Sequence, residues 1–320
     1  MKTFLRFNPS ICSINIGDQI IVKSIIEEMD FLFKDNFCID VSSHQPVSWI
    51  YSERVLVNKD LSFVLGSNLL RGKLNGVDRQ WDINIFNAKK LGPAVLIGTG
   101  WRAYNEEPNA YTKAVYKSIL SKDYCHSVRD AYTEQMMRKM GFSKVINTGC
   151  ATMWKFTPEF CAEIPTKKAN NVITTITDYQ TDIVADKKMI DVLSKNYETV
   201  YIWIQGMGDH SYISELVKQK NNIKFITPIL EAYDNVLNSI DSLDYVGTRL
   251  HGGIRAIQKL KRALIIATDN RAKEKKKDFN LPVLERSEID LLEDWINAEH
   301  ETKISIPIDA IEEWKGQFVL

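Results

Sequence analysis

Two side chains suited to acid–base and anion chemistry lie close together late in the chain. Arg249 and His251 follow an apolar run at 243–246, and the paired glycines Gly252 and Gly253 come directly after them. An arginine offers a planar fork to a phosphate or a carboxylate, and a histidine can move a proton near neutral pH. The glycines would let the backbone approach a ligand closely. The stretch therefore predicts a site for an anionic substrate with a general acid or base beside it.

The elements around this stretch predict where such a site would lie. The apolar run is typical of a buried strand, Gly247 and Thr248 interrupt it, and Ile254, Ile257 and Leu260 then follow at helical spacing. Ligands of open α/β sheets bind at the carboxyl ends of strands, and a helix N-terminus offers free N–H groups to an anion. The alternative is that Arg249 and His251 form only a cap and a surface pair, because no single short motif is specific.

A second candidate site follows the first expected strand. Asn15, Gly17 and Asp18 open a helix, so their N–H groups could hold an anion or a sugar. The alternative is an ordinary helix cap by Asn15 or Asp18. The loop lacks the three glycines of a dinucleotide fingerprint, so the sequence does not support NAD binding.

Two further loops carry candidate ligand contacts. Gly98, Gly100 and Trp101 end a strand, where the glycines could allow close approach to a ligand, or could simply form a tight turn. Trp101 could stack on a sugar or belong to the core. Arg129 precedes a helix and could be a second anion clamp, or a surface arginine paired with Asp130.

No metal site is expected. His126 is next to Cys125, but no third ligand stands at metal spacing. The charged run 273–277 within 271–278 is interpreted as a solvated face, with contact to a membrane surface or an anionic substrate as the lesser alternative.

Composition limits the class of protein. The 320 residues contain 41 basic and 41 acidic side chains, a balance that argues against a nucleic-acid-binding protein. The five cysteines are scattered and form no Cys-x-x-Cys pair, which indicates a reducing compartment. We find no signal peptide and no apolar run of 18 residues, so we expect a cytoplasmic protein without stable membrane insertion, although peripheral contact stays open.

Strands alternate with helices along the whole chain, which predicts an α/β fold of two doubly wound, Rossmann-like domains facing a cleft. The stretch 157–170 carries two prolines and no periodic pattern, and it is the expected linker. The expected domains are 1–160 and 170–305, with 306–320 a C-terminal helix that packs back on the body. Strands are expected at 3–7, 37–41, 62–65, 94–97, 126–128, 144–147, 172–177, 199–204, 223–226, 243–246 and 263–267. Helices are expected at 17–28, 110–120, 131–140, 182–195, 209–219, 231–240, from 250 onward, at 288–296 and at 308–318.

Taken together, the motifs resemble those of the polysaccharide pyruvyl transferase family. Asn-x-Gly-Asp at 15–18, Val-Leu-Gly-Ser-Asn at 64–68, Ile-Gly-Thr-Gly-Trp at 97–101, Ser-Val-Arg-Asp at 127–130, Thr-Gly-Cys-Ala-Thr at 148–152 and Gly-Thr-Arg-Leu-His-Gly-Gly at 247–253 occur in that order. The fourth and sixth of these, which contain Ser-Val-Arg-Asp and Thr-Arg-Leu-His-Gly, are the most specific. The sequence departs from the family at 66–68, where many members carry a glycine run.

The resemblance implies a fold similar to that of two-domain, GT-B-like glycosyltransferases, and an activity. The family transfers the enolpyruvyl carbons of phosphoenolpyruvate onto two sugar hydroxyls, giving a cyclic pyruvate ketal and free phosphate. His251 would be the general acid, Arg249 a contact to phosphoenolpyruvate with help from the backbone of Leu250, and Arg129 the second clamp. Sugar contacts would come from Asn15, Gly17, Asp18, Gly98, Gly100 and Trp101. The N-terminal domain would be the acceptor side and the C-terminal domain the donor side.

The sequence thus predicts an enzyme of surface-polysaccharide (exopolysaccharide) biosynthesis that needs no metal or cofactor beyond its donor substrate. Its acceptor would be a sugar or glycan, with a lipid or nucleotide carrier left open. Two alternatives remain: a nucleotide-sugar-dependent glycosyltransferase on the same scaffold, and a non-catalytic binding protein.

Overall fold

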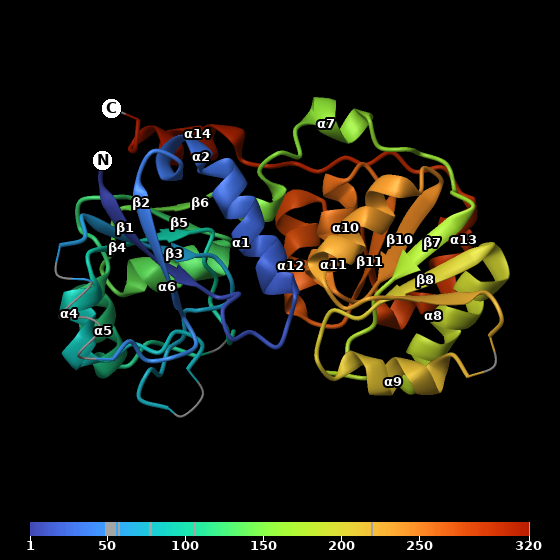
Figure 1. Cartoon of the computed structure of the whole chain (residues 1–320), viewed down its shortest axis with the longest axis horizontal. Coiled ribbons are helices and arrows are strands. Elements are labelled where there is room, and N and C mark those ends of the chain that lie inside the picture. Colours follow the sequence, from blue (N-terminus) through green and yellow to red (C-terminus); the bar gives the residue numbers. More distant parts are fainter. Residues whose placement is uncertain (49–55, 57, 77–78, 105, 219, 320) are drawn as a thin grey trace. The chain divides into compact units, whose positions relative to one another are not determined.

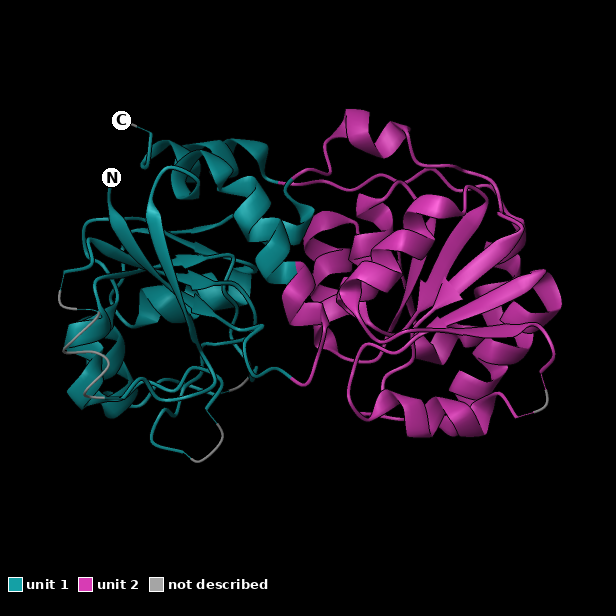
Figure 2. Cartoon of the chain, viewed as in Figure 1, with its two compact units in different colours: residues 1–13, 21–154, 307–320 teal, residues 14–20, 155–306 magenta. Residues whose placement is uncertain are grey.

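The computed structural model of the chain divides into two compact units (Figure 1, Figure 2). It describes residues 1–48, 56, 58–76, 79–104, 106–218 and 220–319. Unit 1 comprises residues 1–13, 21–154 and 307–320, and unit 2 comprises residues 14–20 and 155–306. The main division falls at 154/155, before the stretch expected as a linker. Residues 14–20 belong to unit 2 although unit 1 flanks them in sequence, and residues 307–320 belong to unit 1 although they follow unit 2.

Unit 1 is built on parallel strands. A four-stranded sheet has the order β2-β1-β3-β4, and β5 pairs with β6. A bridge between Thr99 and Val128 continues the parallel pairing from the end of β4 toward β5. The strands are β1 (Thr3–Asn8), β2 (Phe37–Ser42), β3 (Leu61–Leu65), β4 (Ala94–Ile97), β5 (His126–Val128) and β6 (Val145–Asn147). The helices are α1 (Gly17–Glu28, whose first residues group with unit 2), α2 (Asp30–Phe33), α4 (Ile85–Leu91), α5 (Ala110–Ile119), α6 (Ala131–Lys139), η1 (Ala151–Met153) and α14 (Ile308–Gly316).

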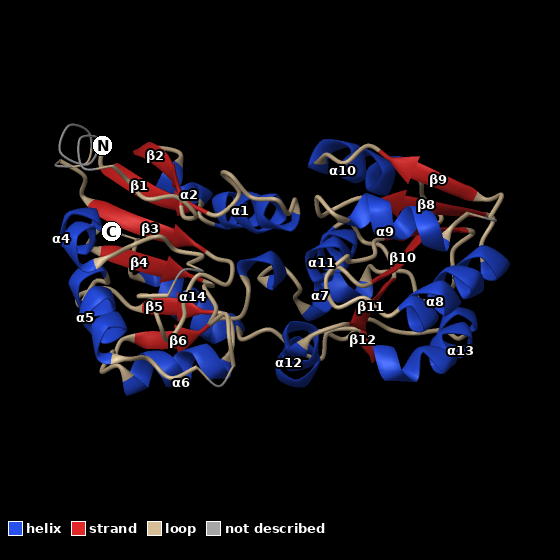
Figure 3. Cartoon of the chain, turned by 90° about the horizontal axis from the view of Figure 1, so that it is seen from below, coloured by secondary structure: helices blue, strands red, loops and turns tan. Residues whose placement is uncertain are grey.

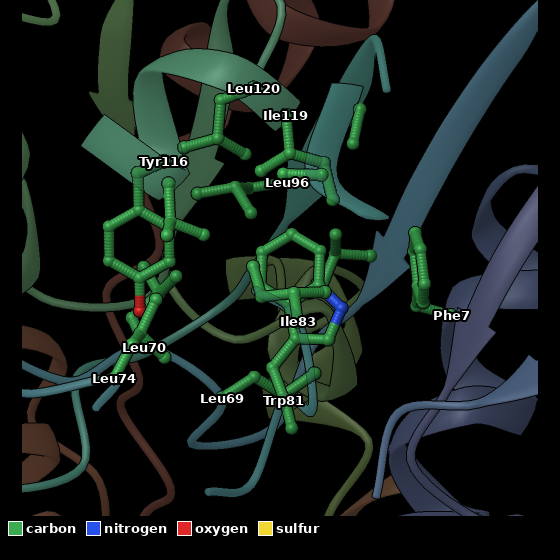
Figure 4. Packing of buried hydrophobic residues seen from close by; sticks show 14 of the residues in the cluster. Phe7, Leu69, Leu70, Leu74, Trp81, Ile83, Leu96, Tyr116, Ile119 and Leu120 are labelled. Atoms are coloured by element: carbon green, nitrogen blue, oxygen red, sulfur yellow. The ribbon is translucent and has the colours of Figure 1, made fainter. Parts of the chain in front are cut away.

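The core of unit 1 is rich in aromatic rings (Figure 4). Trp81 packs edge-on against Phe7 of β1, with ring centroids 5.2 Å apart, and stacks on Tyr116 of α5 at 6.3 Å. All three side chains are almost fully buried. Burial of this much apolar area fixes α5 on the sheet and thereby the strand ends that carry the candidate residues of this unit.

Unit 2 is a six-stranded parallel sheet with the order β12-β11-β10-β7-β8-β9. From β7 the chain adds β8 and β9 on one side, and then β10, β11 and β12 on the other. The winding direction of the sheet therefore changes at the neighbouring strands β7 and β10. Such a switch point opens a crevice at the carboxyl ends of the two strands. The strands are β7 (Asn171–Thr174), β8 (Thr199–Trp203), β9 (Ile223–Ile226), β10 (Leu243–Gly247), β11 (Ala263–Ala267) and β12 (Val283–Glu285).

Helices cover both faces of this sheet (Figure 3). Val200, Val246 and Leu264 alternate with residues of the opposite face and pack under α8, α9 and α13. On the other face Tyr233 of α10 stacks on Trp203 of β8, with ring centroids 4.0 Å apart. The helices are α7 (Pro158–Ala162), α8 (Ile183–Asn196), α9 (Asp209–Leu216), α10 (Leu230–Ser239), α11 (Leu250–Gln258), α12 (Asn270–Phe279), η2 (Arg286–Leu291) and α13 (Leu292–Asn297).

Every expected strand and helix is present, with shifts of a few residues at some ends. Two stretches for which no helix was expected contain one. The linker contains α7, which Thr157 caps with its hydroxyl and Pro158 begins. The charged stretch 271–278 is helix α12, and Lys275 is 4% exposed, because its stem lies in one apolar stripe with Ala272 and Phe279.

Within the described residues, no helix has the length and apolar character needed to cross a membrane.

Candidate functional site

Arg249 lies at the switch point of unit 2. It follows β10 and occupies the N-cap position of α11, and only 4% of its surface is exposed. Its guanidinium meets Asp178, which follows β7, and Asp209, which begins α9. Three strand ends thus converge on one cation, at the place where an open α/β sheet binds its ligand.

Asp209 holds the guanidinium from the side of the protein interior. Nε of Arg249 donates to Oδ2 of Asp209 at 3.1 Å, and Nη2 donates to Oδ1. The backbone N–H groups of Gly206 and Asp178 donate to the same carboxylate, at 2.8 and 3.0 Å. Burial raises the pKa of the Asp209 carboxyl, and these hydrogen bonds counteract the rise.

Asp178 contacts Arg249 from the solvent side. Its Oδ1 accepts from Nη2 at 3.2 Å, and its side chain is 39% exposed. The ring of Tyr179 lies 4.9 Å from the guanidinium carbon of Arg249. Among the described residues none accepts a hydrogen bond from Nη1 of Arg249.

The glycines of the β8–α9 loop make room for this cluster. A Cβ on Gly206 would stand 2.1 Å from Nη2 of Arg249, and one on Gly208 would stand 1.9 Å from Oδ2 of Asp178. Gly252 and Gly253, which we expected to admit a ligand, instead admit protein: a Cβ on Gly253 would stand 2.5 Å from Ile265 and 2.8 Å from Tyr245. Close packing of α11 on the sheet is therefore their role.

The first turn of α11 carries His251 and Leu250. His251 is 7% exposed and Leu250 8%. Arg249, the N-cap residue, makes no side-chain cap hydrogen bond to this turn. Tyr245 fixes the turn by donating from its hydroxyl to the carbonyl of Arg249 at 2.8 Å. A helix N-terminus next to an arginine is an arrangement that favours anions.

The loop expected on the acceptor side lies against this same region of unit 2. Asn15 accepts from the N–H of Gly17 at 3.0 Å and from Nε2 of Gln205 at 2.9 Å. Ile16 and Gln205 share a backbone hydrogen bond of 2.9 Å. Asp18 is half-buried in the first turn of α1. The structure therefore groups Asn15, Gly17 and Asp18 with the residues expected to bind the donor.

Arg129 has a related environment in unit 1. It is 3% exposed, and its Nε donates to Oδ2 of Asp130 at 3.2 Å. Asp130 also caps α6 by accepting from the N–H of Thr133 at 2.7 Å. No described residue accepts from either Nη atom of Arg129, so more of its fork is open than in Arg249.

Among the neighbouring strand-end residues, Gly100 packs against Arg129, Gly98 packs against the backbone of Ala151, and Trp101 lies in the core. A Cβ on Gly100 would stand 2.0 Å from Nε of Arg129, and Gly98 has a φ of +55° beside the backbone of Ala151. The Trp101 side chain has no exposed surface, and its indole N–H donates to the carbonyl of Glu106 at 3.3 Å. Trp101 is a core residue in this structure, so it cannot stack on a sugar here.

His126 is a structural histidine. Its Nε2 lies 2.9 Å from the carbonyl of Ser121, and the N–H of Leu96 donates to its Nδ1 at 3.3 Å. Burial lowers the pKa of His126 to about 4, so the ring is neutral at physiological pH. Among the described residues no group of three or more histidine, cysteine, aspartate or glutamate side chains could hold a metal ion.

The sequence analysis missed Asp178, Gly206, Gly208 and Asp209. Each follows a predicted strand, and Gly-x-Gly-Asp at 206–209 is a glycine-rich loop that opens a helix. That signal could have been found, but pairing the loop with Arg249 needs the order β10-β7-β8, which the sequence does not specify.

Comparisons with known proteins agree with this architecture. Residues 15–270 match the family described as polysaccharide pyruvyl transferase, which covers most of the chain. A comparison with curated protein sequences finds no significant match.

Among solved structures, UDP-GlcNAc 2-epimerase from Neisseria meningitidis bound to UDP-GlcNAc is similar, with a TM-score of 0.50 and 14% identity over 100% of this chain and 99% of that one. MnaA of S. aureus with UDP gives 0.49 and 12%, over 98% and 94%. The E. coli heptosyltransferase WaaC with ADP gives 0.41 and 12%, over 82% and 87%. These identities show the fold alone, which is an α/β architecture of two Rossmann-like domains with parallel sheets.

Proposed function

Because the chain belongs to the polysaccharide pyruvyl transferase family, we propose that it forms a pyruvate ketal on a sugar of a surface-polysaccharide precursor, with phosphoenolpyruvate as donor. The observation that carries the proposal is the cluster at the switch point of unit 2. There Nη1 of Arg249 has no acceptor among the described residues and lies at the N-terminus of α11, of which His251 is the second residue.

His251 is proposed as the general acid. Ketal formation requires a proton on the methylene carbon of phosphoenolpyruvate, which turns C3 into a methyl group and makes C2 an oxocarbenium-like centre. One sugar hydroxyl attacks C2 and loses its proton. The C2–O bond to phosphate then breaks, and the second hydroxyl attacks C2, loses its proton and closes the ring. Of the two hydroxyl protons, one restores the acid and the other leaves with the phosphate. A positioned group that gives up a proton near neutral pH suits the first step.

The anionic groups of the donor need cationic partners. Phosphoenolpyruvate carries a phosphate and a carboxylate, and a guanidinium binds either through two parallel hydrogen bonds. Arg249 offers Nη1, and the N–H groups of Leu250 and its neighbours offer the helix terminus. Arg129 is proposed as the second clamp because both of its Nη atoms are open.

The acceptor side is proposed with fewer residues than the sequence indicated. Asn15 remains a candidate because it is half-buried beside Gln205 and Gly206, next to Arg249. Gly17 and Asp18, in the same loop, are proposed as acceptor contacts together with Asn15. Gly100 is a supporting residue of Arg129 in this proposal, and Gly98 and Trp101 have no acceptor role in it.

The test is phosphate release from phosphoenolpyruvate across a panel of sugar acceptors, with mass detection of the products. His251→Gln should lower turnover by roughly 10²–10⁴-fold, because it removes the acid and keeps a side chain of similar size. The matched control is His210→Gln, which changes an exposed histidine of the same unit and should leave turnover unchanged.

The outcomes separate the alternatives. A product heavier by one pyruvyl ketal, lost in His251→Gln, would support both the reaction and the acid. Near-normal turnover in that variant would remove His251 from the mechanism. No release with any acceptor, together with thermal stabilisation by a nucleotide sugar, would favour a glycosyltransferase. Binding of phosphoenolpyruvate that is never consumed would favour a binding protein or an acceptor outside the panel.

A further inference from the structure

The two carboxylates on Arg249 differ in how firmly they are held. Asp209 is fully buried and accepts four hydrogen bonds, two from the guanidinium and two from backbone N–H groups. Asp178 makes one contact to the guanidinium, at 3.2 Å, through a side chain that is 39% exposed. Rotation toward solvent would release Asp178 at little cost, since half-exposed ion pairs contribute little to stability. Asp209 has no such route.

The charge of the cluster is wrong for an anion site. One arginine and two aspartates sum to one negative charge, whereas the proposed donor carries a phosphate and a carboxylate. Like charges within a few ångströms oppose binding, and partial burial reduces their screening by solvent. An anion can therefore bind well at Arg249 only after one carboxylate has left.

We propose that in the donor-free protein Asp178 holds Nη2 of Arg249, which with the open Nη1 forms the anion position, and that Asp178 is displaced when phosphoenolpyruvate binds both Nη atoms. Asp178 is thereby a residue that sets donor affinity, whereas Asp209 keeps the guanidinium in place in both states. The inference rests on the proposed function, because it takes phosphoenolpyruvate as the anion that arrives.

The loop around Asp178 suits this exchange. Tyr179 shares its ring between Arg249, at 4.9 Å, and Arg271, at 5.6 Å. Gln180 has a φ of +53°, and its carbonyl accepts from Nη1 of Arg286 at 2.5 Å. Two arginines other than Arg249 therefore hold the loop, so the Asp178 carboxylate can leave while its neighbours stay anchored.

Two variants weaken the contact between Asp178 and Arg249 in different ways. Asp178→Asn removes its charge. Gly208→Ala keeps the charge but places a Cβ 1.9 Å from Oδ2 of Asp178, and the φ of −88° at Gly208 suits alanine. The atom that must move is the end of a flexible side chain, so the fold should be kept. The matched control is Asp191→Asn, which removes a half-exposed carboxylate of unit 2 that pairs with Lys220.

The experiment is titration calorimetry of the full chain with phosphoenolpyruvate, without acceptor. Asp178→Asn should bind up to about fivefold more tightly than wild type, the gain expected from losing one competing ion pair. Gly208→Ala should shift affinity in the same direction by less, and Asp191→Asn should bind as wild type does. Thermal unfolding checks that each variant is folded.

The outcomes distinguish the two proposals. Tighter binding in Asp178→Asn but not in Asp191→Asn would establish the displacement. Unchanged or weaker binding in Asp178→Asn, or equal tightening in the control, would overturn the role of Asp178 and leave the proposed function standing. A folded wild-type protein that binds no phosphoenolpyruvate would overturn the proposed function and this inference together.

Discussion

Arg249→Ala should destabilise unit 2 as well as remove a ligand contact. Asp209 has no exposed surface, and the guanidinium is its only charged partner among the described residues. Breaking a buried ion pair by deleting one partner typically costs about 3–5 kcal/mol. The N–H groups of Gly206 and Asp178 remain as donors, so we expect a loss near the lower limit, about 3 kcal/mol at pH 7.

The loss should depend on pH in a defined direction. Burial already raises the pKa of Asp209 above its ordinary value, and removal of Arg249 raises it further. A carboxyl whose pKa is higher in the folded state destabilises that state as pH rises through the folded pKa, and does so least below the unfolded value. The deficit of Arg249→Ala relative to wild type should therefore be smaller at pH 5 than at pH 8.

Urea unfolding of wild type, Arg249→Ala and Arg249→Ala/Asp209→Asn measures this. The second substitution removes the unpaired charge, so the double variant should recover more than half of the lost stability while still failing to bind phosphoenolpyruvate. A single-variant loss below about 1 kcal/mol, or no recovery in the double variant, would refute the reasoning. The double variant is then the proper reference for activity, because an inactive Arg249→Ala could simply be unfolded.

Two further predictions concern a glycine and a histidine. Gly206→Ala places a Cβ 2.1 Å from Nη2 of Arg249, so phosphoenolpyruvate affinity measured by calorimetry should weaken by about tenfold or more. This change is opposite in sign to that expected for Gly208→Ala. An affinity equal to that of wild type would show that the guanidinium can shift freely. His126 has a folded pKa of about 4 against 6.5, so the unfolded state takes up its proton first and the free energy of unfolding should fall by about 3 kcal/mol as pH drops from about 6.5 to about 4. His126→Gln should remove that part of the pH dependence in urea titrations, and an identical pH profile would contradict the assignment.

Much of the fold could be predicted because the chain alternates short apolar runs with helical periodicity. Helix α12 was not predicted, since an apolar stripe that includes Lys275 looks like a charged surface in sequence. Burial of the lysine stem depends on the neighbouring strand, which periodicity alone cannot show. Helix α7 was likewise hidden among the prolines of a presumed linker, although a threonine followed by a proline is an ordinary helix start.

The candidate site was predicted in part, and the reason lies in topology. Arg249 and His251 stand in one short stretch, where a glycine and a threonine mark the change from strand to helix. Asp178 and Asp209 lie 71 and 40 positions away and reach Arg249 only because β7 stands between β8 and β10. Trp101 illustrates the reverse case, because a tryptophan after a strand suits a sugar platform and a core equally well until its burial is known.

The two units hold their arginines in the same way, and that construction limits where a ligand can bind. Arg129 lies over Gly100 with its Nε on Asp130, and Arg249 lies over Gly206 with its Nε on Asp209. In each case a carboxylate takes the inner edge of the guanidinium, which lets a cation be more than nine-tenths buried without an unpaired charge. In the proposed function the outer Nη edge is the part left for substrate, so an incoming anion would meet a fixed fork whose own charge is already balanced. Affinity at such a fork depends on geometry and on what else occupies the outer edge, which is why a single exposed carboxylate at Asp178 is expected to matter.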